Sequence, residues 1–253
     1  MNLKSLRKLD LGACVTQRPT YFLSVTHIGG GGWADDILPR ADLLRRFVAD
    51  VAGRDGVDLV TVGDIVELWQ FDREAILLAH GDLVREIECR RARGVRGNHD
   101  WRWRDECGYR YGSCLDTGNL SDTLCVWHGH QADPFNSGLL WSVGNAAAWI
   151  AGELQRLGWH DADQVETWTR WWTPGSMDDA TFAHVQHRYL DWAKSELDSS
   201  RYFLCVLGHT HRPALTDLGD GRAVLDCGSW VSHLPPTVGY VERSRVELLE
   251  VQE

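Results

Sequence analysis

The feature that most constrains the fold is a series of short apolar runs that each lead into side chains able to bind a cation. Val95, for example, is followed by Gly97 and three polar residues, and Val62 is followed by Gly63 and Asp64. The side chains placed in this way are His27, Asp64, Asn98, His99, Asp100, His128, His130, His209 and His211. Ligand sites of open α/β sheets gather at the carboxyl ends of strands. The pattern therefore predicts one shared site.

The apolar periodicities predict strands and helices that alternate in the first part of the chain. The predicted strands cover residues 21–25, 57–62, 94–96, 123–127, 202–207, 222–226 and 238–251. The predicted helices cover residues 39–51, 71–89, 139–157 and 178–197. Alternation of this kind is typical of parallel sheets with helical crossovers. The last part is mostly strand, so we expect an α/β fold.

The domain organisation follows from where this pattern starts and where it is interrupted. Residues 1–19 have no clear period, and we expect a loose N-terminal arm ahead of one domain over residues 20–253. The predicted helices within residues 136–200 form an insertion that is rich in tryptophan. Its tryptophans are Trp141, Trp149, Trp159, Trp168, Trp171, Trp172 and Trp192. Two interpretations stay open: a helical pair buried on the sheet, or a lid over a substrate with an apolar or aromatic part.

Charge and cysteine usage narrow the class of protein. The chain has 253 residues and a formal net charge of -10, which makes nucleic acid an unlikely partner. The seven cysteines are irregularly spaced and contain no Cys-x-x-Cys pair, which argues against a disulfide framework and a thiolate zinc finger. No apolar run reaches membrane length. We expect a cytoplasmic protein with free thiols and no membrane span.

The side chains at the strand ends suit a particular group of metals. Imidazoles, a carboxylate and an amide oxygen favour Mn, Fe, Zn or Ni over Ca or Cu(I). One carboxylate can bridge two cations about 4 Å apart, and such a pair can clamp the oxygens of a phosphoryl transfer. The sequence thus predicts a centre that holds one or two divalent transition metals.

The order of these motifs resembles that of the calcineurin-like metallophosphoesterases. The resemblance is carried by His27, by Gly63-Asp64-Ile65-Val66-Glu67, by Gly97-Asn98-His99-Asp100, by His128 and by Gly208-His209-Thr210-His211. Trp69, the His128-Gly129-His130 segment and Gly228-Ser229-Trp230 are similar to the branch that contains the UDP-2,3-diacylglucosamine pyrophosphatases, with His130 in place of an aspartate. The resemblance implies a four-layer α-β-β-α sandwich with a helical insertion.

The resemblance also implies a role for each site residue. Asp64 would bridge the two cations, His27 and His211 would hold the first, and Asn98, His128 and His209 would hold the second. His99 would protonate the leaving oxygen or steady the phosphate, and Asp100 would orient its ring. The implied activity is hydrolysis of a phosphomonoester, phosphodiester or pyrophosphate bond of a small molecule by in-line attack of a metal-bound hydroxide.

One position departs from the family pattern. Val25 stands where the family has an aspartate, two residues before His27, and valine cannot coordinate a metal. Asp35 or Asp36 could replace the lost ligand. The alternative function is a catalytically impaired scaffold that binds a partner through the tryptophan-rich insertion.

Arginines near the motifs suggest two further roles. Arg96, Arg102, Arg104 and Arg212 are candidates to grip a phosphate. Two interpretations of Arg102 and Arg104 stay open: they share one face of a strand, or they belong to a solvated face. A third reading of the chain, a nuclease, would need a basic groove. Basic residues around Arg90 and Arg102 keep this reading open.

Overall fold

The computed structural model describes the chain except residues 33, 104–114, 117–122, 133–149, 151–178 and 232–233. The first half contains β1 (Asn2–Asp10), β2 (Thr16–Leu23), η1 (Leu38–Arg40), α1 (Ala41–Ala52), β3 (Asp58–Val62), α2 (Arg73–Arg90), β4 (Arg93–Val95), β5 (Leu115–Asp116) and β6 (Leu124–Val126). The second half contains η2 (His130–Ala132), α5 (Asp179–Asp198), β7 (Leu204–Leu207), β8 (Ala214–Gly219), β9 (Arg222–Asp226), β10 (Thr237–Arg243) and β11 (Arg245–Gln252).

The described strands form two mixed sheets. The first has the order β1-β11-β10-β2-β3-β4, in which β2, β3 and β4 are parallel and the other pairs are antiparallel. The second has the order β5-β6-β7-β9-β8, with β6, β7 and β9 parallel. The predicted α/β class is confirmed, and in both sheets the parallel strands occupy neighbouring positions. Their carboxyl ends therefore lie along one edge of each sheet.

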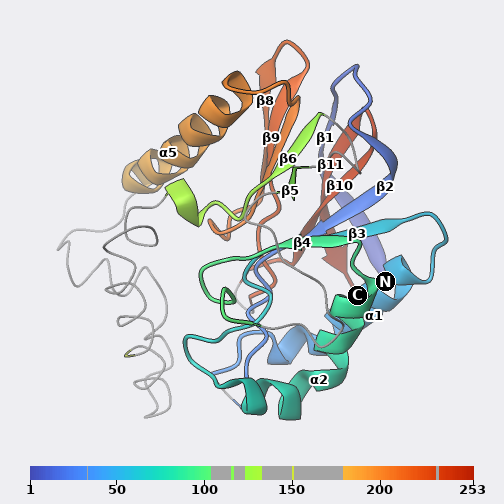
Figure 1. Ribbon diagram of the computed structural model, residues 1–253, viewed down its shortest axis with the longest axis vertical. Coiled ribbons are helices and arrows are strands. Elements are labelled where there is room, and N and C mark those ends of the chain that lie inside the picture. Colours follow the sequence, from blue (N-terminus) through green and yellow to red (C-terminus); the bar gives the residue numbers. More distant parts are fainter. Residues whose placement is uncertain (33, 104–114, 117–122, 133–149, 151–178, 232–233) are drawn as a thin grey trace.

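Three buried clusters fix the order of the layers. One lies between the first sheet and helices α1 and α2, a second lies between the two sheets, and a third lies between the second sheet and α5. Figure 1 shows α5 on one side of the two sheets and α1 and α2 on the other. The sequence of layers is thus helix, sheet, sheet, helix.

Strand β7 shows why the central strands read as continuous apolar runs. Leu204 and Val206 belong to the cluster between the sheets, whereas Cys205 and Leu207 pack in the cluster against α5. All four side chains are buried. Successive side chains of a strand point to opposite faces, so a strand that is covered on both faces cannot alternate between apolar and polar residues.

The N-terminal segment corrects the prediction of a loose arm. Strand β1 pairs antiparallel with β11 from Asn2 to Asp10, and the register shifts between Ser5 and Arg7. Because of this bulge, the side chains after it point to the opposite face of the sheet from the one that strict alternation would give. Leu3 consequently packs with the helix-side cluster, and Leu9 packs with the cluster between the sheets. The reversal removes the period of two from the sequence, which explains why the strand was missed.

Most of the other predicted elements are present with shifted ends. The helices predicted over 39–51, 71–89 and 178–197 correspond to η1 with α1, to α2 and to α5. The strand predicted over 238–251 is a hairpin of β10 and β11, which turns at Arg243 with φ 55. Strand β8 was not predicted. The helix predicted over 139–157 lies almost wholly outside the described residues.

The tryptophans of the insertion can be judged only in part. Trp192 lies on α5 and packs edge-on against Trp127, with ring centroids 5.6 Å apart, in the cluster under that helix. This contact agrees with the interpretation of a helix buried on the sheet. The other six tryptophans of the insertion fall outside the described residues. No helix in the described part of the chain is long and apolar enough to cross a membrane.

Among the cysteines that the structure describes, all but Cys89 agree with the predicted free thiols. Cys14, Cys125, Cys205 and Cys227 are free. Cys89, near the end of α2, is disulfide-bonded, which the sequence analysis did not predict. The cytoplasmic location stays a prediction.

Candidate metal centre

The predicted site residues follow the carboxyl ends of five parallel strands from both sheets. The first sheet supplies His27 after β2, Asp64 after β3, and Asn98 and His99 after β4. The second sheet supplies His128 after β6, and His209 and His211 after β7. Short turns place these side chains at one common edge of the sandwich.

Several residues other than glycine have a left-handed backbone conformation in these turns. His27, Asp64, His209 and His211 have φ values of 43°, 52°, 69° and 60°. Val25 has φ 50°, which is a rare conformation for a β-branched residue. Such conformations cost about 1–3 kcal/mol each and cluster at functional sites. The turns therefore place these side chains at a cost in folding stability.

Two glycines allow the turns to pack against each other. A Cβ atom at Gly97 would lie 1.9 Å from Asp64 Oδ1, and one at Gly63 would lie 2.4 Å from His128 Nδ1. Gly63 also has φ 83°. A side chain at either position would therefore displace Asp64 or His128.

Asp64 lies at the centre of the cluster and is 1% exposed. Its Oδ2 atom is 2.9 Å from His128 Nε2 and 4.0 Å from His27 Nε2, while Oδ1 accepts a hydrogen bond of 2.9 Å from the backbone N–H of His99. Two groups of candidate ligands share this carboxylate. One comprises His27, Asp64 and His99, and the other comprises Asp64, His128 and His209, with all ligand atoms in each group within 4.8 Å.

The ring of His128 is held so that its Nε2 atom faces Asp64. Nδ1 lies 2.8 Å from the carbonyl oxygen of Val62, which can only accept, so Nδ1 carries the hydrogen. Nε2 is buried 2.9 Å from a carboxylate oxygen but has no hydrogen-bond geometry with any described group. Two lone pairs at this distance repel unless a proton or a cation lies between them.

Glu67 was missed by the sequence analysis, although it ends the Gly-Asp-x-x-Glu motif. Its Oε2 atom is 2.6 Å from His27 Nδ1 and 2.6 Å from His99 Nδ1, and its Oε1 atom accepts from the backbone N–H of Trp69 at 2.9 Å. The carboxylate thereby fixes two imidazoles at once. The spacing of three residues after Asp64 was the signal that could have identified it.

The role predicted for Asp100 is wrong. Its Oδ1 and Oδ2 atoms accept hydrogen bonds from the backbone N–H groups of Gly97 and Ile65, at 2.7 and 2.8 Å. Asp100 thus ties the turn after β4 to the turn after β3, and Glu67 contacts the His99 ring in its place.

Asp35 does not replace the ligand that Val25 lacks. Its carboxylate accepts from the backbone N–H groups of Gly29 and Gly31, at 3.1 and 2.8 Å. It also lies 2.7 Å from Nε2 of His80 on α2. These contacts use both oxygens to hold the glycine-rich loop. Asp36 is half-buried and close enough to His27 to raise the pKa of that imidazole.

The electrostatics of the cluster favour anionic carboxylates. Burial opposes ionisation of Asp64, but the charges of His128 and His99 hold its pKa well below the usual value. Burial likewise opposes ionisation of Glu67, but His99 and His27 lower its pKa to about 2. Burial disfavours the charged form of His27, yet the hydrogen bond and charge of Glu67 raise its pKa to about 9.

His211 differs from His27 in charge. Burial and the nearby charges of His27 and His209 hold the pKa of His211 well below its usual value, so its ring is neutral. The ring centroids of His27 and His211 are 5.3 Å apart. A neutral imidazole is the form that binds a cation, and His211 is thus ready to do so.

The residues fit a divalent transition metal. Nε2 of His27 and Nε2 of His128 are both buried and have no hydrogen-bond partner among the described residues. Each faces the shared Asp64 carboxylate. Buried ring nitrogens without a hydrogen-bond partner among the described residues, beside an anionic oxygen, are an arrangement that a cation would satisfy once the ring has lost its extra proton. Asn98, also buried, follows Gly97 in the same turn.

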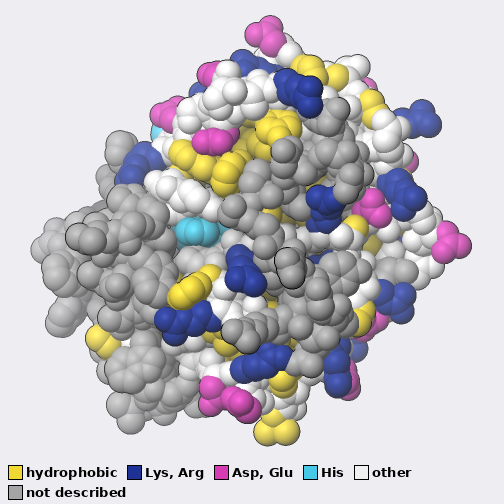
Figure 2. Space-filling model, viewed as in Figure 1, with side chains coloured by type: hydrophobic (Ala, Val, Ile, Leu, Met, Phe, Trp, Pro, Cys, Tyr) yellow, Lys and Arg dark blue, Asp and Glu magenta, His cyan; other side chains and the backbone are white. Residues whose placement is uncertain are grey.

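A cavity adjoins the centre. Figure 2 shows one face of the molecule, viewed as in Figure 1, on which Lys and Arg side chains lie near an exposed histidine. A cavity of about 160 Å³ lies between α5 and the second sheet and is lined by Tyr189, Thr210, Arg212 and Asp226, among others. The Tyr189 ring lies 5.7 Å from that of His209, so the cavity adjoins the centre.

The arginine predictions have mixed outcomes. Arg212 lines the cavity. Arg96 donates to the carbonyl oxygen of Trp101 at 2.8 Å, and Arg102 lies over the Trp101 ring at 4.6 Å. Residues 101 and 102 form a turn, so the predicted strand face is wrong there, and Arg104 lies outside the described residues.

No protein-family model and no curated protein matches the chain. Solved structures match with low scores. A metallophosphoesterase from Sphaerobacter thermophilus is 16% identical, with a TM-score of 0.46 and coverage of 93% of this chain and 88% of that chain. Vacuolar Protein Sorting 29 from Cryptosporidium parvum is 13% identical, with a TM-score of 0.45 and coverage of 94% and 93%. The zinc complex of Vps29 from Entamoeba histolytica is 15% identical, with a TM-score of 0.42 and coverage of 88% and 85%. At these values none of them transfers a function to this chain.

Proposed function

We propose that the chain is a metal-dependent phosphoesterase that hydrolyses a phosphoester or pyrophosphate bond of a small molecule. The observation that carries the proposal is the buried Asp64 carboxylate, which two groups of imidazoles share. Bound divalent cations would supply positive charge for the phosphoryl oxygens and lower the pKa of a water molecule. Asp64 would be the bridging ligand, with His27 and His211 on one side and Asn98, His128 and His209 on the other.

The chain's own hydrogen bonds support this division of tasks. The Val62 carbonyl fixes the tautomer of His128, and Glu67 fixes that of His27, so both rings present Nε2 toward Asp64. The backbone hydrogen bonds of Asp100 hold the turn that carries Asn98. Together these contacts keep the ligand atoms in place before a cation arrives.

The substrate is proposed to be a phosphoester whose remaining part lies in the cavity beside His209. Tyr189 offers an aromatic wall, and Arg212 offers a cation that suits a phosphate. Burial raises the pKa of Asp226 in the same cavity to about 7, so near neutral pH this group can both donate and accept hydrogen bonds.

A panel of model substrates tests the proposal. Protein treated with chelator is assayed with p-nitrophenyl phosphate, bis-p-nitrophenyl phosphate and a nucleoside diphosphate sugar, before and after addition of Mn(II), Zn(II), Ni(II) or Fe(II). We expect turnover of at least one substrate that appears with metal and disappears with chelator. Folded, metal-loaded protein that turns over none of these bond classes would contradict it.

The alternative is a scaffold without catalytic activity. The observation that favours it is Val25, which is fully buried in a left-handed conformation where a metal ligand is expected. A scaffold would retain bound metal and an intact fold and show no turnover in the same panel.

A further inference from the structure

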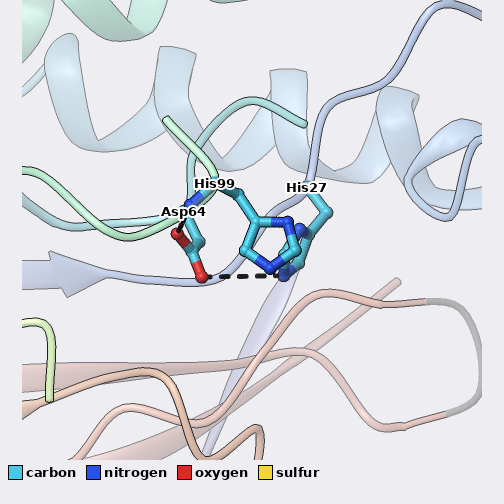
Figure 3. A group of neighbouring side chains, drawn as sticks. All are labelled: His27, Asp64 and His99. Atoms are coloured by element: carbon cyan, nitrogen blue, oxygen red, sulfur yellow. Dashed lines mark hydrogen bonds and ion pairs between the residues drawn. The ribbon is translucent and has the colours of Figure 1, made fainter. Parts of the chain in front are cut away.

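We infer that His99 is a ligand of the first cation and takes the place that Val25 leaves without a carboxylate. This inference rests on the proposed metal-dependent function and departs from the proton-transfer role that the motif resemblance implies. The first candidate group comprises His27, Asp64 and His99, whose ligand atoms lie within 4.8 Å of one another. Figure 3 shows both imidazoles beside the Asp64 carboxylate.

The hydrogen bonds of His99 leave the correct nitrogen for a cation. Its Nδ1 atom is 2.6 Å from Glu67 Oε2, and a carboxylate oxygen accepts, so Nδ1 carries the hydrogen. His27 makes the same contact, at the same distance, to the same oxygen. In both rings Nε2 is therefore the nitrogen that remains for a cation. Carboxylate-bound imidazoles of this kind are typical of metal ligands.

The His99 ring is also fixed on its face. Trp69 stacks on it with ring centroids 4.0 Å apart and an interplanar angle of 19°. The Trp69 indole donates from Nε1 to the backbone carbonyl oxygen of Asn98 at 2.7 Å, which locks the indole to the same turn. The His99 and His27 rings meet edge to face, with centroids 4.5 Å apart. A ring held on two sides keeps one direction, as a metal ligand does.

His99 would give the first cation a fourth protein ligand. Without it the first cation would have His27, Asp64 and His211, because Val25 offers no donor and Asp35 is engaged with the glycine loop. With it the set is three imidazoles and one carboxylate. Ligand atoms about 2.0–2.2 Å from a metal in a tetrahedral site lie about 3.3–3.6 Å apart. The atoms of this group lie within 4.8 Å of one another and would draw closer on binding.

Metal stoichiometry of His99→Gln tests the inference. The variants His99→Gln, Val25→Asp and the double variant are loaded with Cd(II) or Mn(II), dialysed and analysed by atomic emission. ¹¹³Cd NMR counts the sites and reports nitrogen against oxygen ligands. His187→Gln, which removes an exposed imidazole on α5 that lines the cavity but belongs to neither ligand group, is the matched control for metal content alone. Circular dichroism establishes that each variant is folded.

We expect two cations per chain in the unmodified protein and in the control, and one in His99→Gln. The first cation should bind at least about 100-fold more weakly in that variant, since removal of outer-shell partners alone costs about 10–100-fold. Adding Val25→Asp to it should restore the second equivalent, with a ¹¹³Cd shift that moves toward oxygen ligation.

Two results would overturn the inference. If folded His99→Gln keeps both cations and loses turnover, His99 acts on the substrate, and the phosphoesterase proposal stands without it. If the unmodified protein binds no cation under any loading condition, the inference and the proposed function both fail. Loss of one cation from His99→Gln supports the inference even where no turnover is found, so the two proposals can fail separately.

Discussion

The two sides of the Asp64 carboxylate are built differently. On the side of His128 and His209, the ligand ring is fixed by a backbone carbonyl, that of Val62. On the side of His27 and His99, both rings are fixed by one charged group, Glu67, and Val25 lies two residues before His27. A backbone carbonyl cannot be lost by substitution or titration, whereas a side chain can. The ring orientation on the His27 side therefore depends on the Glu67 side chain, whereas that of His128 depends on the backbone.

Asp64→Asn should affect both halves and give the largest change. The amide retains an oxygen for the His99 N–H but loses the negative charge that two cations share. We expect loss of both cations and a fall of at least about 100-fold in any metal-dependent turnover. Atomic emission and the model-substrate panel measure these effects. Asp226→Asn, which alters a buried carboxylate outside the ligand groups, is the control and should keep both cations.

The pH dependence of stability should separate metal-free from metal-loaded protein. The pKa of His27 rises from 6.5 to about 9 on folding, so its contribution is fully present below pH 6.5 and is lost as pH rises toward 9. The loss is on the order of 3 kcal/mol, or about 300-fold in the unfolding equilibrium. Chemical denaturation in chelator from pH 6 to pH 9.5 measures it. With metal bound, the dependence should shrink, because the cation replaces the proton on Nε2.

The variant Glu67→Gln tests whether His27 causes this pH dependence of stability. Removing the charge removes the main cause of the raised His27 pKa, so metal-free protein should lose less stability between pH 6.5 and 9. The dependence that comes from Asp226, whose pKa burial raises to about 7, should remain. An unchanged pH profile in this variant would show that His27 is not the titrating group.

The same Glu67→Gln variant should weaken only one half of the centre. Its amide cannot accept from two imidazoles as a carboxylate does, so the His27 side loses orientation. We expect the first cation to bind about 10–100-fold more weakly and the second to change little. Competition with a chelating dye measures both constants. Equal weakening of the two cations would remove the distinction between the halves.

Val25→Asp should change metal binding least, and it should strengthen binding where the other variants weaken it. Aspartate tolerates the left-handed backbone better than valine, and it adds an anionic ligand. We expect about tenfold tighter binding of the first cation. Thermal unfolding should show a larger rise in Tm on adding metal than in the unmodified protein. Val25→Asn, with a similar shape and no charge, separates relief of strain from the added ligand.

The sequence could predict the positions of the ligands better than their hydrogen bonds. Apolar runs covered on both faces, such as β7, identify strands, and strand ends identify the edge that holds a site. The partner of the His99 ring was not predictable in this way. Asp100 is its neighbour in sequence, but the turn directs both Asp100 oxygens to backbone N–H groups. Glu67 reaches the ring from another turn, and only the packing of two turns determines that contact.

The N-terminal strand illustrates a second limit. Its apolar residues Leu3, Leu6 and Leu9 fit neither a helical nor a strand period, because the bulge at Leu6 moves the later residues to the other face. A strand with one interruption has the same pattern as an irregular segment. Pairing with β11, at the far end of the chain, decides between them, and the local sequence carries no record of that partner.

The candidate ligands of the centre come from both sheets, and this has a mechanical consequence. His27, Asp64 and His99 belong to one sheet, whereas His128, His209 and His211 belong to the other. A cation bound to members of both sets would act as a cross-link between the two halves of the sandwich at an edge where polar turns replace the apolar packing found deeper inside. Chelation should then loosen the seam between the sheets at this edge first, and amide hydrogen exchange there should quicken before that of the distant strands.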